Sequence, residues 1–324
     1  MAALPESPEI RVVDLCNISA PELAPVLQEE LHEWRAALHW DLSSSTELVE
    51  RFAGMQALNG CALMAGARVI GYSYFVCEDR KALIGDLYVM KRERTPERER
   101  ALIDGSLETL WRESGLRRVE AQWLMLDPGT RPSGRLPFAT WFRSYPRLFL
   151  EVETGVVPRL RECSVSNIGI TNWLESRHQE PSGWLVAAAY RGHSDSEIND
   201  QYRSPGGARR FLTNIVQYPG CGTFFAPASF AVFDQQSHTL CGIVLASLIA
   251  EDAGHITQVC VAPSHKGVGL GYELMRRALV ALGAQGCRTV SLTVTASNHE
   301  ALRLYERMGF TKKRDFSAFV WQEG

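Results

Sequence analysis

The residues from His265 to Gly271 carry the clearest chemical signal in this sequence. They read His-Lys-Gly-Val-Gly-Leu-Gly and lie between an apolar, strand-like run and an amphipathic, helix-like stretch. Glycines allow positive φ angles and close approach of backbone N–H groups to a ligand, and a helix N-terminus adds partial positive charge. The pattern therefore predicts a cradle for an anion such as a phosphate. It is not a Walker A loop, and Tyr272 stands where a dinucleotide fingerprint needs its third glycine.

A second pattern follows one further strand-like run. It reads Asn298-x-x-Ala301-x-x-Leu304-Tyr305-x-x-x-Gly309-Phe310. An asparagine before a helix and a glycine after it are typical cap and stop residues. Taken alone, this pattern predicts a capped amphipathic helix.

Strand-like and helix-like runs alternate around the two patterns. A capping-box pair, Ser194 and Glu197, predicts a helix running towards Tyr218. A strand–helix–strand crossover between residues 255 and 294 requires those two strands to be parallel, with a mixed sheet around them. The expected strands are 229–233, 241–250, 255–262, 290–294 and 316–321, and the expected helices are 270–285 and 298–308.

The first half of the chain repeats this order weakly. Leu87-Tyr88-Val89, a helix-like segment and a strand mirror Val259-Cys260-Val261 and the elements after it, at an offset of about 171 residues. We therefore predict an α/β fold made of two copies of one domain, 1–155 and 182–324, with a linker at 156–181. The first copy has no glycine in the segment that follows Val89, and it lacks the second pattern.

Together the two patterns resemble those of the GNAT superfamily of acyl-CoA-dependent N-acetyltransferases, over about residues 183–324. The resemblance implies two tandem GNAT-like domains, each a mixed, mostly antiparallel sheet with a central parallel strand pair flanked by helices, the first copy being degenerate. In that family a strand aligns the pantetheine of acetyl-CoA, the glycine loop holds its pyrophosphate, and a later helix lines the other side. By position, the implied cofactor-binding residues are Val259, Cys260, Val261, Lys266, Gly267, Val268, Gly269, Leu270, Gly271, Tyr272, Asn298, Ala301 and Tyr305. One departure is Lys266, where the family has Arg or Gln.

Two residues are candidates for proton transfer. The resemblance places Tyr305 where family members protonate the coenzyme A sulfur, although a tyrosine there can also serve packing alone. His255 lies on the cofactor-aligning strand, and a histidine with a reference pKa near 6.5 can accept a proton from an amine at neutral pH. A purely local role for His255 stays open, and the rival bases are Gln258, Glu251 and Asp252.

The resulting hypothesis is an enzyme that moves an acetyl group from acetyl-CoA to an amine by direct attack, at one site in the C-terminal copy. The acceptor is a small molecule or a peptide. The alternative is a non-catalytic acyl-CoA sensor or interaction module.

Composition narrows the partners and the location. A net charge of −3 without a basic stripe argues against nucleic acid, and the longest apolar runs fall short of the roughly 20 residues that a membrane helix needs. The eight cysteines have no CxxC spacing, so no metal site is expected. The first residues have no basic or apolar leader pattern, which predicts a cytoplasmic protein. The oligomeric state is open.

Overall fold

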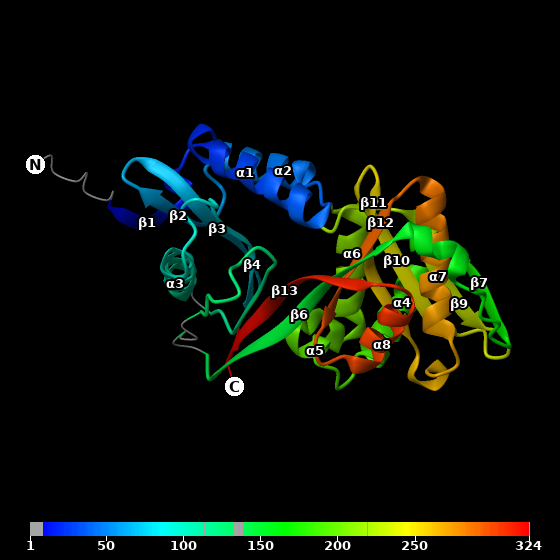
Figure 1. Ribbon diagram of the computed structural model, residues 1–324. Coiled ribbons are helices and arrows are strands. Elements are labelled where there is room, and N and C mark those ends of the chain that lie inside the picture. Colours follow the sequence, from blue (N-terminus) through cyan, green and yellow to red (C-terminus); the bar gives the residue numbers. More distant parts are fainter. Residues whose placement is uncertain (1–8, 113–114, 133–135, 137–138, 219, 324) are drawn as a thin grey trace, which may run out of the picture. The chain divides into compact units, whose positions relative to one another are not determined.

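The computed structural model describes residues 9–112, 115–132, 136, 139–218 and 220–323 (Figure 1). The chain divides into two compact units. Unit 1 comprises Met1–Trp34, Ser43–Tyr145 and Phe316–Gly324, and unit 2 comprises Arg35–Leu42 and Pro146–Asp315.

Unit 1 contains the sheet order β1-β2-β3-β4-β5-β13. Its strands β4 and β5 are parallel, and the last strand β13 pairs with β5 through Ser317–Gln322. The elements are β1 (Ile10–Asp14), most of α1 (Ala20–Leu38), α2 (Ser43–Gly54), β2 (Gly60–Ala65), β3 (Arg68–Glu78), β4 (Lys81–Val89), α3 (Pro96–Arg112), β5 (Arg118–Trp123) and part of β13 (Thr311–Gln322).

Unit 2 contains the order β6-β12-β11-β10-β9-β7, and the short β8 pairs with β10. Strands β11 and β12 are parallel, whereas β10 pairs antiparallel with both β11 and β9. The elements are most of β6 (Trp141–Glu153), β7 (Ile168–Asn172), α4 (Glu175–Ala189), α5 (Asp195–Ile198), α6 (Pro205–Gln217), β8 (Thr223–Phe224), β9 (Phe230–Asp234), β10 (Leu240–Ala250), β11 (Ala253–Val261), α7 (Leu270–Gln285), β12 (Thr289–Thr295) and α8 (His299–Arg307).

Two cores flank the sheet of unit 2. One face packs against the apolar stripe of α7 and against Tyr305 of α8, and the other packs against α4 and α6. The predicted stripe of α7 is buried as expected, since Leu270, Leu274 and Leu282 are at most 1% exposed. Gly286 ends the helix in a left-handed conformation with φ 103°, which confirms it as the predicted stop.

The predicted single helix from Ser194 towards Tyr218 is wrong. Helix α5 ends at Ile198, a 3₁₀ turn follows, and α6 begins at Pro205. The side chains of Asn199 and Ser204 each accept a backbone N–H, from Gln201 and Gly207 respectively. Each of these caps begins a new helical segment, the 3₁₀ turn and α6 respectively, so the predicted single helix is divided.

Strand registers confirm the internal repeat. In unit 1, Lys81–Ile84 pair in parallel with Arg118–Ala121, and in unit 2, Ala253–Ile256 pair in parallel with Thr289–Leu292. In each unit the register along the first of these strands shifts by one extra residue directly after the paired stretch. Each unit thus contains the same four-residue parallel contact followed by a β-bulge, and the predicted mixed α/β fold is confirmed.

The unit boundaries differ from the expected divisions at 155 and 182. The strand β7 lies inside the expected linker and belongs to the sheet of unit 2, whereas residues 316–324 belong to unit 1. Strand pairing between distant segments sets these boundaries, and sequence order does not reveal such pairing.

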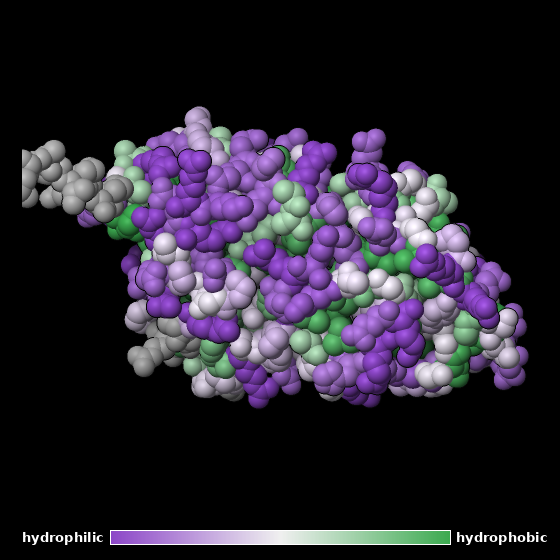
Figure 2. Space-filling model, viewed as in Figure 1, coloured by the Kyte–Doolittle hydropathy of each residue, from purple (hydrophilic) through white to green (hydrophobic). Residues whose placement is uncertain are grey.

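Hydrophilic side chains cover most of the face shown in Figure 2, and hydrophobic residues lie there in small separate areas. Among the helices of the described residues, none is long and apolar enough to cross a membrane. Residues 1–8, which contribute to the expectation of a cytoplasmic protein, lie outside the described residues.

Candidate active site

Strand β11 has a free backbone edge beyond its contact with β12. The parallel pairing ends at Ile256, while β11 continues to Val261. Ala262 donates its N–H to Cys241 on β10, so by alternation the backbone groups of Val259 and Val261 point away from β10. Consistent with this, the Val259 carbonyl accepts a hydrogen bond from the Tyr190 hydroxyl at 3.4 Å. An extended ligand with amide groups can pair with this edge.

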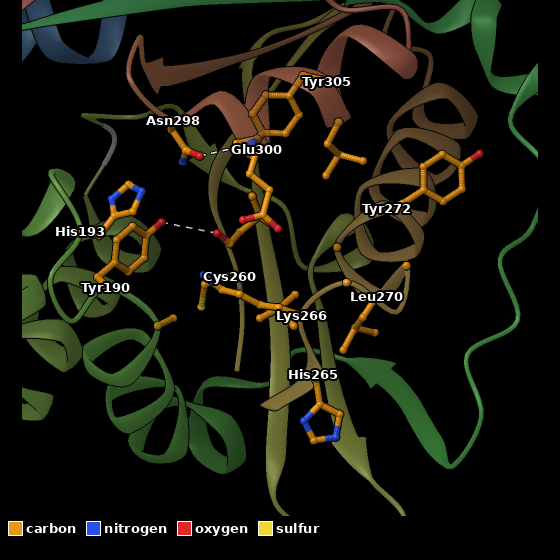
Figure 3. A pocket seen from close by; sticks show the side chains of 18 of the residues that line it. Tyr190, His193, Cys260, His265, Lys266, Leu270, Tyr272, Asn298, Glu300 and Tyr305 are labelled. Atoms are coloured by element: carbon orange, nitrogen blue, oxygen red, sulfur yellow. Dashed lines mark hydrogen bonds between the residues drawn. The ribbon is translucent and has the colours of Figure 1, made fainter. Parts of the chain in front are cut away.

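A cavity of about 380 Å³ lies along that edge in unit 2 (Figure 3). Its walls come from the end of α4, from β11, from the glycine-rich loop, and from α7 and α8. Of the predicted cofactor-binding residues, all except Val268 line it, and the half-exposed Val268 side chain does not. The structure thus brings together two sequence patterns that lie more than twenty residues apart along the chain.

The glycine-rich loop leaves the N-terminus of α7 open. Gly267 and Gly269 have φ angles of 81° and 89°, which L side chains rarely adopt. Gly269 caps the helix without any side-chain hydrogen bond. A Cβ atom at Gly269 would also lie 2.5 Å from the Cys163 sulfur. The first N–H groups of α7 are therefore unshielded, as an anion cradle requires.

Asp234, at the end of β9, holds the start of this loop through His265. Its Oδ2 lies 3.2 Å from Nε2 of His265. Hydrogen bonds from the Ser237 backbone N–H and from His265 lower the pKa of Asp234 to about 2. The carboxylate is consequently ionised at neutral pH and holds the start of the loop.

Helix α8 places Tyr305 in the cavity wall. The Asn298 side chain accepts the backbone N–H of Ala301 at 3.2 Å, so the predicted N-cap is confirmed. Tyr305 is 7% exposed and its ring centroid lies 5.7 Å from that of Phe310. Burial and the nearby Asp195 carboxylate raise the pKa of Tyr305, so its hydroxyl keeps its proton. Within the described part of the chain, this hydroxyl has no hydrogen-bond partner.

Two stacked tyrosines lie on the opposite side, and Tyr190 is the one of the pair that lines the cavity. The rings of Tyr190 and Tyr202 lie 4.5 Å apart. The buried Gln258 amide joins them, because its Nε2 donates to the Tyr190 hydroxyl at 3.0 Å and its Oε1 accepts from the Tyr202 hydroxyl at 3.1 Å. Gln258 thus fixes the position of both rings. Both ends of its amide are used in these hydrogen bonds, so Gln258 is not available as the base.

Tyr190, His193 and Glu300 line the cavity, and sequence reasoning did not single them out. Nδ1 of His193 accepts the Asp195 N–H at 3.1 Å. Figure 3 shows the Glu300 carboxylate extending from α8 into the cavity. The aromatic end of the apolar run 184–190 is the available sequence signal for the α4 side of this wall.

The structure does not bring His255 to the cavity. His255 is 4% exposed, and its Nδ1 lies 2.8 Å from Oγ of Ser291 on the adjacent strand. Burial lowers the pKa of His255 to about 3. The ring packs at 4.9 Å from Trp40. The geometry therefore gives no support to His255 as the base.

The rival bases Glu251 and Asp252 do not line the cavity either. Both lie in the turn between β10 and β11. Asp252 pairs with Arg288, which lowers the pKa of its carboxyl group.

The corresponding region of unit 1 is filled by its own carboxylates. Glu29 and Glu33, both on α1, face the end of β4 and the segment after it. The Lys91 N–H donates to Glu29 at 2.6 Å, and the Arg94 guanidinium donates to both oxygens of Glu33 at 2.9 and 2.8 Å. The Tyr88 hydroxyl donates to Glu33 as well, at 2.7 Å. Burial raises the pKa of Glu33, but the bonds from Arg94 and Tyr88 outweigh it, so the net shift is downward.

The N-terminus of α3 is likewise occupied. Thr95 caps it by accepting the Arg98 N–H at 3.3 Å, and Glu97 and Glu99 lie in its first turn. These groups already complement the helix dipole. Both helices have glutamate in the first turn, and the difference lies in the cap: Thr95 takes up an N–H of α3, whereas Gly269 of α7 has no side chain to do so.

Residues 195–310 match the family model described as the acetyltransferase (GNAT) family. This chain contains a GNAT domain. The match spans α5 to α8, and so includes the glycine-rich loop and Tyr305. It also spans most of the cavity walls in unit 2.

Two relatives resemble parts of this chain. A mycothiol acetyltransferase of Saccharopolyspora erythraea is 34% identical over 28% of this chain and 29% of its own length. The N-alpha-acetyltransferase MAK3 of Arabidopsis thaliana is 38% identical over 19% of this chain and 32% of its own length. Each alignment therefore spans about a third of the relative.

A solved structure resembles the whole chain. It is a tandem GNAT protein from the clavulanic acid biosynthesis pathway, with a TM-score of 0.60 and 15% identity over 98% of this chain and 99% of that one. At this identity the likeness concerns the fold, and it agrees with the repeat seen in the strand registers.

Proposed function

We propose that unit 2 is an N-acetyltransferase, with acetyl-CoA as the acetyl donor and an amine as the acceptor. One observation carries the proposal. A single cavity joins the free edge of β11, the open N-terminus of α7 and the unpartnered hydroxyl of Tyr305. Two relatives are named as a mycothiol acetyltransferase and an N-alpha-acetyltransferase, and these names support the same reaction class.

The residues present fit acetyl-CoA. The backbone of Val259 and Val261 would pair with the amides of its pantetheine arm, and the N–H groups after Gly269 would bind its pyrophosphate. The exposed Lys266 adds a positive charge at the loop. When bound, acetyl-CoA supplies the acetyl group as a thioester. No metal is part of the proposal.

Tyr305 would donate the proton that the departing sulfur needs. In the balanced reaction a C–N bond forms and the C–S bond breaks, the nitrogen loses a proton to water, the sulfur gains the proton of Tyr305, and a proton from water then restores Tyr305. Burial holds Tyr305 protonated, and the hydroxyl has no competing acceptor among the described residues.

Direct attack is favoured over an acyl-enzyme route. Cys260 is the thiol in the cavity wall, and burial raises its pKa to about 12. A thiol that stays protonated is a poor nucleophile.

The test is release of coenzyme A thiol from acetyl-CoA in the presence of small amines and short peptides. We expect thiol release matched by an equal amount of N-acetylated product for at least one acceptor class. A non-catalytic acyl-CoA sensor would bind acetyl-CoA but form no product with any amine, and that result would exclude the enzyme.

We also expect one acetyl-CoA site per chain. The carboxylates of Glu29 and Glu33 take up the donors of Lys91 and Arg94 in unit 1, so these donors are not available to a pyrophosphate. Isothermal titration calorimetry of the full chain should give a stoichiometry of about one. Two equivalents of similar affinity would contradict this reading of unit 1.

A further inference from the structure

A second cavity, of about 260 Å³, lies beside the first in unit 2. We call it the side cavity. Tyr190 lines both, and the segment 191–196 that follows it contributes residues to each. The residues of the side cavity are Trp184, Ala187, Ala188, Tyr190, Arg191, Gly192, Ser196, Tyr202, Arg203 and Pro205.

The sequence of α4 explains one wall. Trp184, Ala187 and Ala188 lie on one face of α4, and Arg191 lies in the turn just after the helix ends at Ala189. Two alanines between a tryptophan and an arginine leave a hollow flanked by an indole and a guanidinium group. The indole is 64% exposed, an unusual state for the largest apolar side chain.

The chain turns back after α4 to close the other side. Gly192, with φ 73°, permits the reversal. Arg203 then reaches over the segment, and its Nε donates to the Ser196 carbonyl at 2.8 Å. The terminal nitrogens Nη1 and Nη2 of Arg203 have no hydrogen-bond partner among the described residues.

Charge decides what this cavity accepts. Of its described lining residues, Arg191 and Arg203 are cationic and none is acidic. Arg191 has no ion pair or hydrogen bond within the described residues. Guanidinium groups bind carboxylates through paired N–H donors and also stack on flat rings.

We propose that the side cavity binds the part of the acceptor that carries a carboxylate next to a flat aromatic group, while its amine reaches the first cavity. This inference rests on the proposed function. Tyr190 is the wall that the two cavities share, and Tyr202 stacks on it from the side cavity. Gln258 ties both rings to β11, so an acceptor held here is positioned relative to the free strand edge.

The test compares two amines that differ only in charge, 4-(aminomethyl)benzoate and 4-(aminomethyl)benzamide. With acetyl-CoA and wild-type protein, we expect kcat/KM for the carboxylate to exceed that for the amide by about tenfold or more. Arg191→Gln and Arg203→Gln should each reduce this preference. Both should lower kcat/KM for the carboxylate by more than they lower it for the amide, because only the carboxylate loses an ionic partner.

Arg209→Gln is the matched control. Arg209 lies on α6, pairs with Glu180 at 2.7 Å and does not line either cavity. It should keep the full preference. The proposal is overturned if wild type shows no preference for the carboxylate, or if the preference survives in the Arg191→Gln, Arg203→Gln double variant.

Direct binding separates this inference from the proposed function. If no amine is acetylated, calorimetry with 4-(aminomethyl)benzoate alone still reports on the side cavity. Binding that is lost in the double variant but kept in Arg209→Gln supports the side cavity even though the proposed reaction has failed. Absence of binding to wild type rejects it.

Discussion

Replacing Tyr305 with phenylalanine is expected to lower kcat by about a hundredfold or more, with KM for acetyl-CoA changed by less than about threefold. The substitution removes the hydroxyl that would protonate the sulfur, while the ring keeps its packing at 5.7 Å from Phe310. Because the hydroxyl makes no hydrogen bond among the described residues, its removal leaves no buried partner unpaired. Initial rates of thiol release with saturating amine measure the effect.

Tyr218→Phe provides the control for this prediction. Tyr218 is 61% exposed and lies outside both cavities, so the loss of its hydroxyl should leave kcat within about twofold. An unchanged melting temperature in both variants would show that the fold is intact. If Tyr305→Phe keeps the wild-type kcat under these conditions, Tyr305 is not the proton donor.

Local patterns in the sequence predicted the loop and helix features around the first cavity. The glycine spacing, the stripe of α7, the Asn298 cap and the Gly286 stop each depend on residues a few positions apart. Such features follow from helix geometry and from backbone sterics alone. The loop from Lys266 to Gly271 therefore lies where the sequence indicated.

His255 shows where local reasoning ends. Strict alternation along a strand would put the side chains of His255, Thr257 and Val259 on one face. The register of β11 shifts by one residue at Thr257, so this alternation does not carry through. The parallel pairing with β12 also extends through Ile256. His255 consequently lies where β11 and β12 are still paired, and the cavity begins only beyond Ile256, where these two strands separate.

The unit boundaries and the α4 wall depend on contacts between distant segments. Residues 147–153 complete the sheet of unit 2 through β12, and residues 317–322 complete the sheet of unit 1 through β5. Tyr190 and Gln258 likewise meet across 68 positions of the chain. No short-range pattern in one sequence encodes such pairings, and the side cavity emerged only from the folded arrangement.

Replacing Gly271 with leucine is expected to weaken acetyl-CoA binding by about a hundredfold or more, equivalent to about 2.7 kcal/mol. A Cβ atom at this position would lie 3.7 Å from Leu304 and 3.8 Å from Val261, in ordinary contact. A longer side chain extends into the space between α8 and β11, where the pantetheine arm would lie. The backbone of Gly271 is helical and leucine favours helices over glycine, so the melting temperature should not fall. Calorimetry with acetyl-CoA measures the loss.

Two milder substitutions in α7 distinguish blocked space from a changed helix. Gly271→Ala adds only the tolerated Cβ and should bind acetyl-CoA within about threefold of wild type. Gly283→Ala makes the same change near the other end of the helix, where its Cβ would lie 3.6 Å from Thr154, and should bind as wild type does. If a folded Gly271→Leu variant binds acetyl-CoA with wild-type affinity, the ligand does not pass between α8 and β11. The observation that carries the proposed function would then be lost, because the free strand edge and the open helix N-terminus would not serve one ligand.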